Sequence, residues 1–181
     1  MESLQGKLLI ASPALVDPNF SRAVVLVAHH DEEGAMGLVL SRPSRATVSE
    51  VVPELLELAN GDETVYVGGP VQPSAVIALA EFDEPDEPDA GIFGNVGFVT
   101  EDSDPDDLVG ATRRVRVFAG YAGWGPGQLE AELDEPSWIV EPAREEDVFA
   151  DDPAELWRVV LRRKGGQFAL IARMPDDPSV N

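Results

Sequence analysis

The two histidines of the chain, His29 and His30, are its first candidates for catalysis, because imidazole is the usual proton carrier and metal ligand near neutral pH. They end an apolar run, "AVVLVAHH", that is typical of a β-strand. Side chains alternate across a strand, so we expect one ring in solvent and the other packed beside the sheet, where they cannot share a metal ion. No catalytic residue is assigned, and a hydrolase or metal-dependent enzyme using His29 or His30 stays open as an alternative.

The acidic run "DSDPDD" offers the carboxylate oxygens that calcium prefers. Asp102, Asp104 and Asp106 match the first three ligand positions of an EF-hand loop. The sixth position is Asp107 instead of glycine, and the twelfth is Arg113 instead of glutamate. The run is therefore interpreted as a solvated acidic turn. The chain has no cysteine, which excludes disulfides and thiolate chemistry, and we expect no metal and no cofactor.

The glycine-rich run "GYAGWGPGQLEAEL" poses a choice between an anion cradle and a sharp turn from a strand into a helix. Neither this run nor "GGPVQP" carries the lysine and hydroxyl that a phosphate loop places after its glycines. Gly123 and Gly125 are expected to let the backbone turn, with Pro126 at the first helical position. Trp124 has few local packing partners between two glycines. We predict that it is partly exposed and anchors a binding surface.

Charge is the strongest signal in the composition. The 181 residues include 34 acidic and 13 basic ones, a formal net charge of −21. Such a field repels phosphate, so no direct nucleic-acid binding is expected, although a transcriptional regulator acting on DNA stays open as an alternative. No apolar run approaches the roughly 20 residues of a membrane span, and no signal-peptide pattern is present. We expect a cytoplasmic protein with a protein partner and no membrane contact.

Hydrophobic periodicity predicts an α+β fold. Strand patterns occur at 6–11, 23–30, 35–40, 64–82 (two short strands), 95–100, 113–123, 137–140 and 167–172. Helix patterns occur at 47–59, with a capping box of Thr47 and Glu50, at 126–133 and at 152–164. Residues 1–181 are expected to form one domain. Within it, residues 81–90 are predicted to be a mobile, dispensable acidic loop and residues 175–181 a frayed tail.

Three stretches together resemble the YqgE/AlgH family of bacterial proteins. They are "LLIASPALVDPNFSRAVVLVAHHDEEGAMGLVLSRP", "VYVGGPVQ", and "FAGYAGWGPGQLEAEL" followed by "SWIV". The resemblance implies one domain with a bent, barrel-like, mostly antiparallel β-sheet flanked by helices. It implies no established enzyme reaction, and the AlgH name reflects a proposed role in regulating alginate genes. Ser41 departs from the asparagine that the family usually has before Arg42 and Pro43.

The resemblance also implies a shared surface. Its polar and aromatic members, the ones least explained by architecture, are Asp17, Arg22, Arg42, Trp124 and Gln128. Its structural members are Gly34, Gly37, Gly68, Gly69, Pro70, Gly123, Gly125, Pro126 and Gly127. The sequence thus predicts a non-enzymatic cytosolic binding or regulatory protein.

Overall fold

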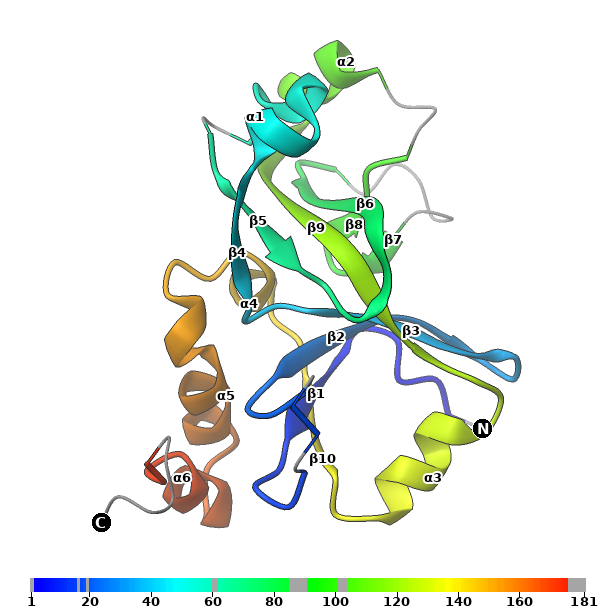
Figure 1. Cartoon of the computed structure of the whole chain (residues 1–181), viewed down its shortest axis with the longest axis vertical. Coiled ribbons are helices and arrows are strands. Elements are labelled where there is room, and N and C mark those ends of the chain that lie inside the picture. The colour runs from blue at the N-terminus through cyan, green and yellow to red at the C-terminus, as the bar shows by residue number, and fades with distance from the viewer. Residues whose placement is uncertain are drawn as a thin grey trace.

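One curled, mostly antiparallel β-sheet organises the protein (Figure 1). The computed structural model describes residues 2–15, 17–18, 20–59, 62–84, 91–100 and 104–175. The strands are β1 (Lys7–Ala11), β2 (Val24–Asp31), β3 (Gly34–Val39), β4 (Pro43–Thr47), β5 (Thr64–Val67), β6 (Val71–Phe82), β7 (Gly91–Phe93), β8 (Val96–Phe98), β9 (Thr112–Trp124) and β10 (Trp138–Pro142). Their order is β10-β1-β2-β3-β9-β6-β8-β7, with β4 paired to β5 and β5 to β9. The predicted fold class is confirmed.

Strand β9 joins the two halves of the sheet. Its last residues pair with β3, with Trp124 opposite Ala35, whereas its earlier residues pair with β6 as far as Thr112 opposite Phe82. Strand β5 runs parallel to it, with Tyr66 opposite Phe118. One long strand therefore serves both halves, and the sheet curls around it as a half-barrel (Figure 1).

Short helices cover the sheet. They are α1 (Val48–Val51), η1 (Pro53–Leu55), α2 (Pro105–Val109), α3 (Gln128–Asp134), α4 (Glu145–Val148), η2 (Pro153–Glu155), α5 (Leu156–Lys164) and α6 (Gln167–Ile171). In Figure 1, α1 and α2 lie at the top, while α5 and α6 lie on the opposite side of the lower strands from α3. None of the helices within the described ranges is both long and apolar enough to cross a membrane.

The alternation of side chains along β1 and β2 separates two of the three cores that the described residues form. Leu8 and Leu26 face a core that includes Trp157 of α5. Leu9 and Val25 face the other, which includes Leu129 of α3, Trp124 and Trp138. A third core lies under α1 and α2. Since a strand shows its odd and even residues to opposite faces, one apolar run packs against both α3 and α5.

The glycine pair Gly68–Gly69 is required by close packing of two backbones. A Cβ at Gly68 would overlap the carbonyl of Gly120, and one at Gly69 would overlap the backbone of Tyr121. Gly69 also has φ of 157°, a value that L side chains rarely adopt. At Gly123 and Gly125 a Cβ would make only ordinary contacts, and the left-handed residue of that turn is Gly127, with φ of 75°. The prediction that Gly123 and Gly125 make the sharp turn is therefore wrong.

Two predicted helix starts differ in the structure. Pro126 is not the first helical residue, because Gly127 is the N-cap and α3 begins at Gln128. The predicted capping box is also absent: the Thr47 hydroxyl donates to the Glu50 carboxylate (3.0 Å) instead of bonding the backbone.

Two predicted elements have a different conformation. The helix expected at 47–59 is only the four-residue α1 followed by the 3₁₀ turn η1, because Pro53 lacks the amide hydrogen that would continue the helix. The strand expected at 167–172 is helix α6. Gly165 and Gly166 both have positive φ and reverse the chain, so that Phe168 packs on the same core as α5.

The acidic loop begins later than predicted. Glu81 is a buried residue of β6, and its carboxylate binds the Arg114 guanidinium at 2.6 Å. Asp83 pairs with Arg113 at 2.9 Å. The prediction of a mobile segment from residue 81 is thus wrong at its start. Residues 85–90 and 176–181, the rest of the predicted loop and most of the predicted tail, lie outside the described part of the chain.

Candidate functional site

Trp124 is a core residue and not an exposed anchor. Only 7% of its surface is accessible, and its ring meets the Trp138 ring edge to face, with centroids 6.4 Å apart. Leu129 of α3 belongs to the same core. The prediction of partial exposure is wrong because Trp138 of β10 and Leu129 of α3 pack against Trp124, although the two residues that flank it are glycines.

Gln128 has a local role. Its Oε1 accepts a hydrogen bond from the Gly125 amide at 3.0 Å, which closes the turn before α3. Helix α3 lies on the opposite side of the lower strands from α5 (Figure 1). Trp124 and Gln128 are therefore separated from Arg22 and Arg42, which lie beside α5.

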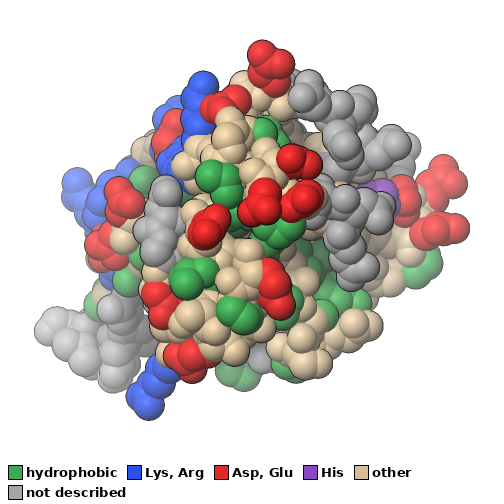
Figure 2. All heavy atoms as spheres, turned by 90° about the horizontal axis from the view of Figure 1, so that it is seen from above, with side chains coloured by type: hydrophobic (Ala, Val, Ile, Leu, Met, Phe, Trp, Pro, Cys, Tyr) green, Lys and Arg blue, Asp and Glu red, His purple; other side chains and the backbone are tan. Residues whose placement is uncertain are grey.

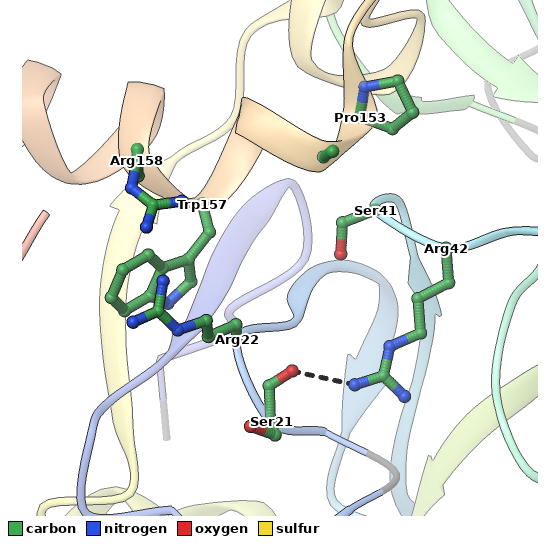
Figure 3. Close-up of a pocket in the computed structure, with 8 residues that line it drawn as sticks. Ser21, Arg22, Ser41, Arg42, Pro153, Trp157 and Arg158 are labelled. Atoms are coloured by element: carbon green, nitrogen blue, oxygen red, sulfur yellow. Dashed lines mark hydrogen bonds between the residues drawn. The ribbon is translucent and has the colours of Figure 1, made fainter. Parts of the chain in front are cut away.

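The structure brings Arg22 and Arg42 together in a hollow of about 180 Å³ beside α5. Arg22 comes from the loop before β2, and Arg42 from the loop between β3 and β4. A third arginine, Arg158, comes from the first turn of α5. In Figure 3, Arg22 and Arg158 lie beside Trp157, and Arg42 lies across from them. We call this site the arginine hollow; its lining residues are Ser21, Arg22, Ser41, Arg42, Pro153, Ala154, Trp157 and Arg158.

Trp157 fixes the position of α5 against the sheet. Its indole Nε1–H donates to the carbonyl of Ala11 at 2.8 Å, and the side chain packs in the core between α5 and the strands. The Arg22 guanidinium lies 4.4 Å from the centroid of its ring. This distance is within the range of a cation–π interaction. One aromatic residue thus holds the helix in place and orients one of the three cations.

Arg22 and Arg158 also bind the end of the described chain. Arg22 Nη2 donates to the carbonyls of Met174 (3.0 Å) and Pro175, and Arg158 Nη2 donates to Met174 at 3.2 Å. Arg22 has φ of 55°, one of the two positive values found at non-glycine residues in the described ranges. A left-handed arginine is uncommon, and such backbone outliers cluster at functional sites.

Arg42 is held by the loop that precedes β2. Its Nη2 donates to the Ser21 carbonyl at 2.9 Å, drawn in Figure 3, and its Nη1 to the Pro18 carbonyl at 3.4 Å. Burial lowers the pKa of Arg42, and the nearby charge of Asp17 opposes this shift. Ser41, at the position where the family usually has asparagine, accepts a hydrogen bond from the Val24 amide (3.3 Å). Three of the five predicted surface residues therefore lie in or next to one site.

His30 is a structural residue. Its Nδ1 accepts the Leu4 amide hydrogen at 2.9 Å, so the ring proton belongs on Nε2, which lies 2.6 Å from Glu130 Oε1. His29 is exposed and pairs with Asp31 at 2.8 Å. The predicted division of the two rings, one solvated and one packed, is confirmed. Both nitrogens of His30 are engaged, which leaves it no acceptor for a substrate proton.

The acidic turn contributes a helix cap. Asp104 Oδ1 accepts from the Asp106 amide at 3.0 Å and starts α2. Asp102 lies outside the described residues. Throughout the described ranges, no three histidine, aspartate or glutamate side chains group in a way that could hold a metal ion.

Sequence reasoning missed Arg158. The helix pattern at 152–164 assigned Trp157 to the core, and the next residue on such a helix lies about 100° around its axis, at the border of the buried face. That position could have suggested that the Arg158 side chain lies at the edge of the buried face of the helix. Nothing in the local pattern indicates that this edge of the helix faces the loops that carry Arg22 and Arg42.

The curled antiparallel sheet and its flanking helices define the class of the protein as an α+β half-barrel. A family model described as AlgH-like matches residues 8–169, and the chain belongs to this family. A UPF0301 protein of Streptomyces avermitilis is 44% identical over 100% of this chain and 97% of its own length. A UPF0301 protein of Thermobifida fusca is 45% identical over 99% of this chain and 96% of its own.

Two solved structures share the fold. A Corynebacterium diphtheriae protein, solved by crystallography, has a TM-score of 0.88 at 28% identity and covers 95% of this chain and 93% of its own. The solution structure of the AlgH protein from Pseudomonas aeruginosa has a TM-score of 0.70 at 30% identity, and covers 98% and 100%. These likenesses establish the family and the fold, and they indicate no specific function.

Proposed function

We propose that this protein is a cytosolic binding protein without enzymatic activity, and that the arginine hollow receives an anionic group carried by a protein partner. The observation that carries this proposal is that three guanidinium groups line one hollow of a chain with a net charge of −21. Cations placed in this way concentrate positive potential at one point of an acidic surface, and an anionic group is what such a point attracts.

The size of the hollow favours a single chemical group as its ligand. Its volume of about 180 Å³ is below the roughly 300–1,000 Å³ of pockets that enclose drug-sized molecules. A whole nucleotide is too large for it, whereas a carboxylate or phosphate at the end of a side chain fits. The remainder of such a ligand would lie on the surface outside, which supports a protein partner.

The residues of the hollow suit binding better than hydrolysis. Arginine stays protonated at physiological pH, and a serine nucleophile such as Ser21 or Ser41 needs a neighbouring base. The described lining residues include no histidine or carboxylate. His30, the buried histidine, is engaged through both ring nitrogens. These contacts weaken the alternative of a hydrolase or metal-dependent enzyme.

A regulator that binds DNA directly has less support. Seen from the α1–α2 end, acidic side chains are spread over the face of the molecule, and basic ones gather at one side (Figure 2). Duplex binding usually needs several lysine or arginine contacts to phosphates along an extended surface. Three arginines in one small hollow do not form such a surface, so a regulatory role would act through a protein.

The anion proposal is tested by titrating the protein with acetate, sulfate and inorganic phosphate at constant ionic strength, with the indole N–H resonance of Trp157 as reporter. We expect saturable shifts with at least one anion, and their loss in Arg42→Gln. Arg162→Gln removes the same charge from the last turn of α5, outside the hollow, and should bind like the wild type. Absence of saturable binding by all three anions would contradict the proposal.

The partner itself is tested by affinity purification from the native host, with the wild type, Arg42→Gln and Arg162→Gln as parallel baits. We expect a protein that is recovered with the wild type and Arg162→Gln but lost with Arg42→Gln. Equal recovery with all three baits would place the partner's contact outside the arginine hollow.

A further inference from the structure

We propose that the ligand of the arginine hollow is a phosphate monoester, such as a phosphorylated side chain of the partner. This inference rests on the proposed function and narrows its anionic group to a tetrahedral dianion. The hollow combines cations from three separate segments: the loop before β2, the loop between β3 and β4, and the first turn of α5.

The number and origin of the arginines favour phosphate over carboxylate. A carboxylate has one charge and two oxygens in a plane, and a single bidentate arginine matches it. A phosphate monoester carries close to two charges at neutral pH and presents three terminal oxygens in different directions. Arg22, Arg42 and Arg158 approach from three segments, which suits the tetrahedral group. Arginine clusters are also a recurrent means of recognising phosphorylated motifs.

The remaining lining adds to this preference. Ser41 accepts a hydrogen bond from the Val24 amide, so its own O–H proton can be donated. Pro153, Ala154 and Trp157 place the start of α5 at the hollow. The positive end of the helix dipole adds to the field of the arginines, and the carboxylate of the N-cap residue Glu155, 3.9 Å from Arg158 Nη1, partly offsets it.

Some hydrogen-bond acceptors of the arginines can be exchanged for the oxygens of a phosphate. Among the acceptors of Arg22 and Arg158 are the backbone carbonyls of Met174 and Pro175, at the end of the described chain. A carbonyl offers a guanidinium only its dipole, whereas a phosphate dianion also offers close to two negative charges. A phosphate dianion can therefore replace these carbonyls, and the end of the chain acts as an internal competitor.

The test is isothermal titration of the full chain at constant ionic strength with inorganic phosphate, a phosphoserine peptide, and the same peptide with glutamate in place of phosphoserine. We expect the phosphoserine peptide to bind at least about tenfold more tightly than the glutamate peptide, because it makes additional charge-assisted hydrogen bonds. Affinity should rise between pH 5 and pH 7.5, as the phosphate loses its second proton near a pKa of roughly 6.

Variants locate the binding. Arg42→Gln and Arg158→Gln should each weaken binding of the phosphoserine peptide about tenfold. The affinity of Arg42→Lys should lie between those of the wild type and Arg42→Gln, because lysine keeps the charge but not the paired N–H donors of the guanidinium. Arg162→Gln should leave affinity unchanged. Thermal melts establish that each variant is folded, and Arg158→Gln provides a second reading if Arg42→Gln is unstable.

The outcomes separate the two proposals. If none of the probes binds, and acetate and sulfate also fail, the proposed function falls together with this inference. If the glutamate peptide binds as tightly as the phosphoserine peptide, the hollow is an anion site but the phosphate assignment is wrong. If inorganic phosphate binds and the phosphoserine peptide does not, the monoester assignment is overturned.

Discussion

The guanidinium of Arg22 lies 4.4 Å from the centroid of the Trp157 ring, and this stacking joins the loop before β2 to helix α5. The backbone of Arg22 has φ of 55°, which costs an L residue roughly 1–2 kcal/mol. The ring and the carbonyls of Met174 and Pro175 offset that cost in the folded protein. A strained backbone therefore holds a cation at the arginine hollow.

Replacing Arg22 by glycine separates this strain from the function of the side chain. Arg22→Gly loses the guanidinium but relieves the backbone, so we expect it to be more stable than Arg22→Ala by roughly 1–2 kcal/mol in urea denaturation. Both variants should lose anion binding. Equal stabilities of the two variants would show that the left-handed backbone of Arg22 carries no strain.

Truncation of Trp124 should damage the core between α3 and the sheet. Because the side chain is buried against Trp138 and Leu129, Trp124→Ala should lower the free energy of unfolding by about 3–5 kcal/mol. Val109 is 48% exposed, and Val109→Ala serves as a control that should change stability by less than about 0.5 kcal/mol. A loss near 1 kcal/mol for Trp124→Ala would contradict its place in the core.

Two glutamates of α3 should respond to pH with opposite signs. A hydrogen bond with its own backbone and then one with His30 lower the pKa of Glu130. Burial is the largest cause that raises the pKa of Glu132, opposed by the nearby indoles of Trp138 and Trp124. Within the described chain, Oε2 of Glu132 and Nε1 of Trp138 are buried without a well-formed hydrogen bond, so the Trp138 indole acts mainly as a neighbouring dipole.

The sign for each residue follows from linkage. A pKa that is lower in the folded state stabilises the protein at pH values above the unfolded-state pKa, and this stabilisation is lost as the pH falls through the folded-state pKa. Glu130→Gln should therefore destabilise the protein at pH 7 and approach the stability of the wild type in acid. A raised pKa costs stability as the pH rises above the unfolded value, so Glu132→Gln should stabilise at pH 7, and this gain should vanish well below pH 4.5. Urea denaturation at pH 7 and at about pH 3 measures both. Changes of the same sign in the two variants at pH 7 would contradict the assignment.

Removing the end of the chain should strengthen phosphate binding. Truncation after Arg173 deletes the Met174 and Pro175 carbonyls that Arg22 and Arg158 bind. It also removes two aspartates, so the double variant Asp176→Asn/Asp177→Asn serves as the charge-matched control. We expect the truncated chain to bind inorganic phosphate severalfold more tightly than this control. Equal affinities would show that the carbonyls do not compete.

The sequence by itself determined most of the strands. The apolar runs of β1, β2, β3 and β9 are continuous or alternate with period two, and this pattern depends on local side-chain geometry alone. It also placed His29 and His30 on opposite faces. The shortened helix at α1 was visible in the sequence through Pro53, and the prediction gave too little weight to this local signal.

Only the tertiary structure decided which residues are buried and which share a site. Trp124 is flanked by glycines, yet β10 and α3 bring Trp138 and Leu129 against it. "QFALIA" has a strand-like composition, yet two glycines reverse the chain and it packs as α6 beside α5. Arg22, Arg42 and Arg158 are separated by up to 136 residues, from 22 to 158, and line one hollow because Trp157 fixes α5 to β1. Burial and convergence depend on contacts between distant segments, which a local pattern does not contain.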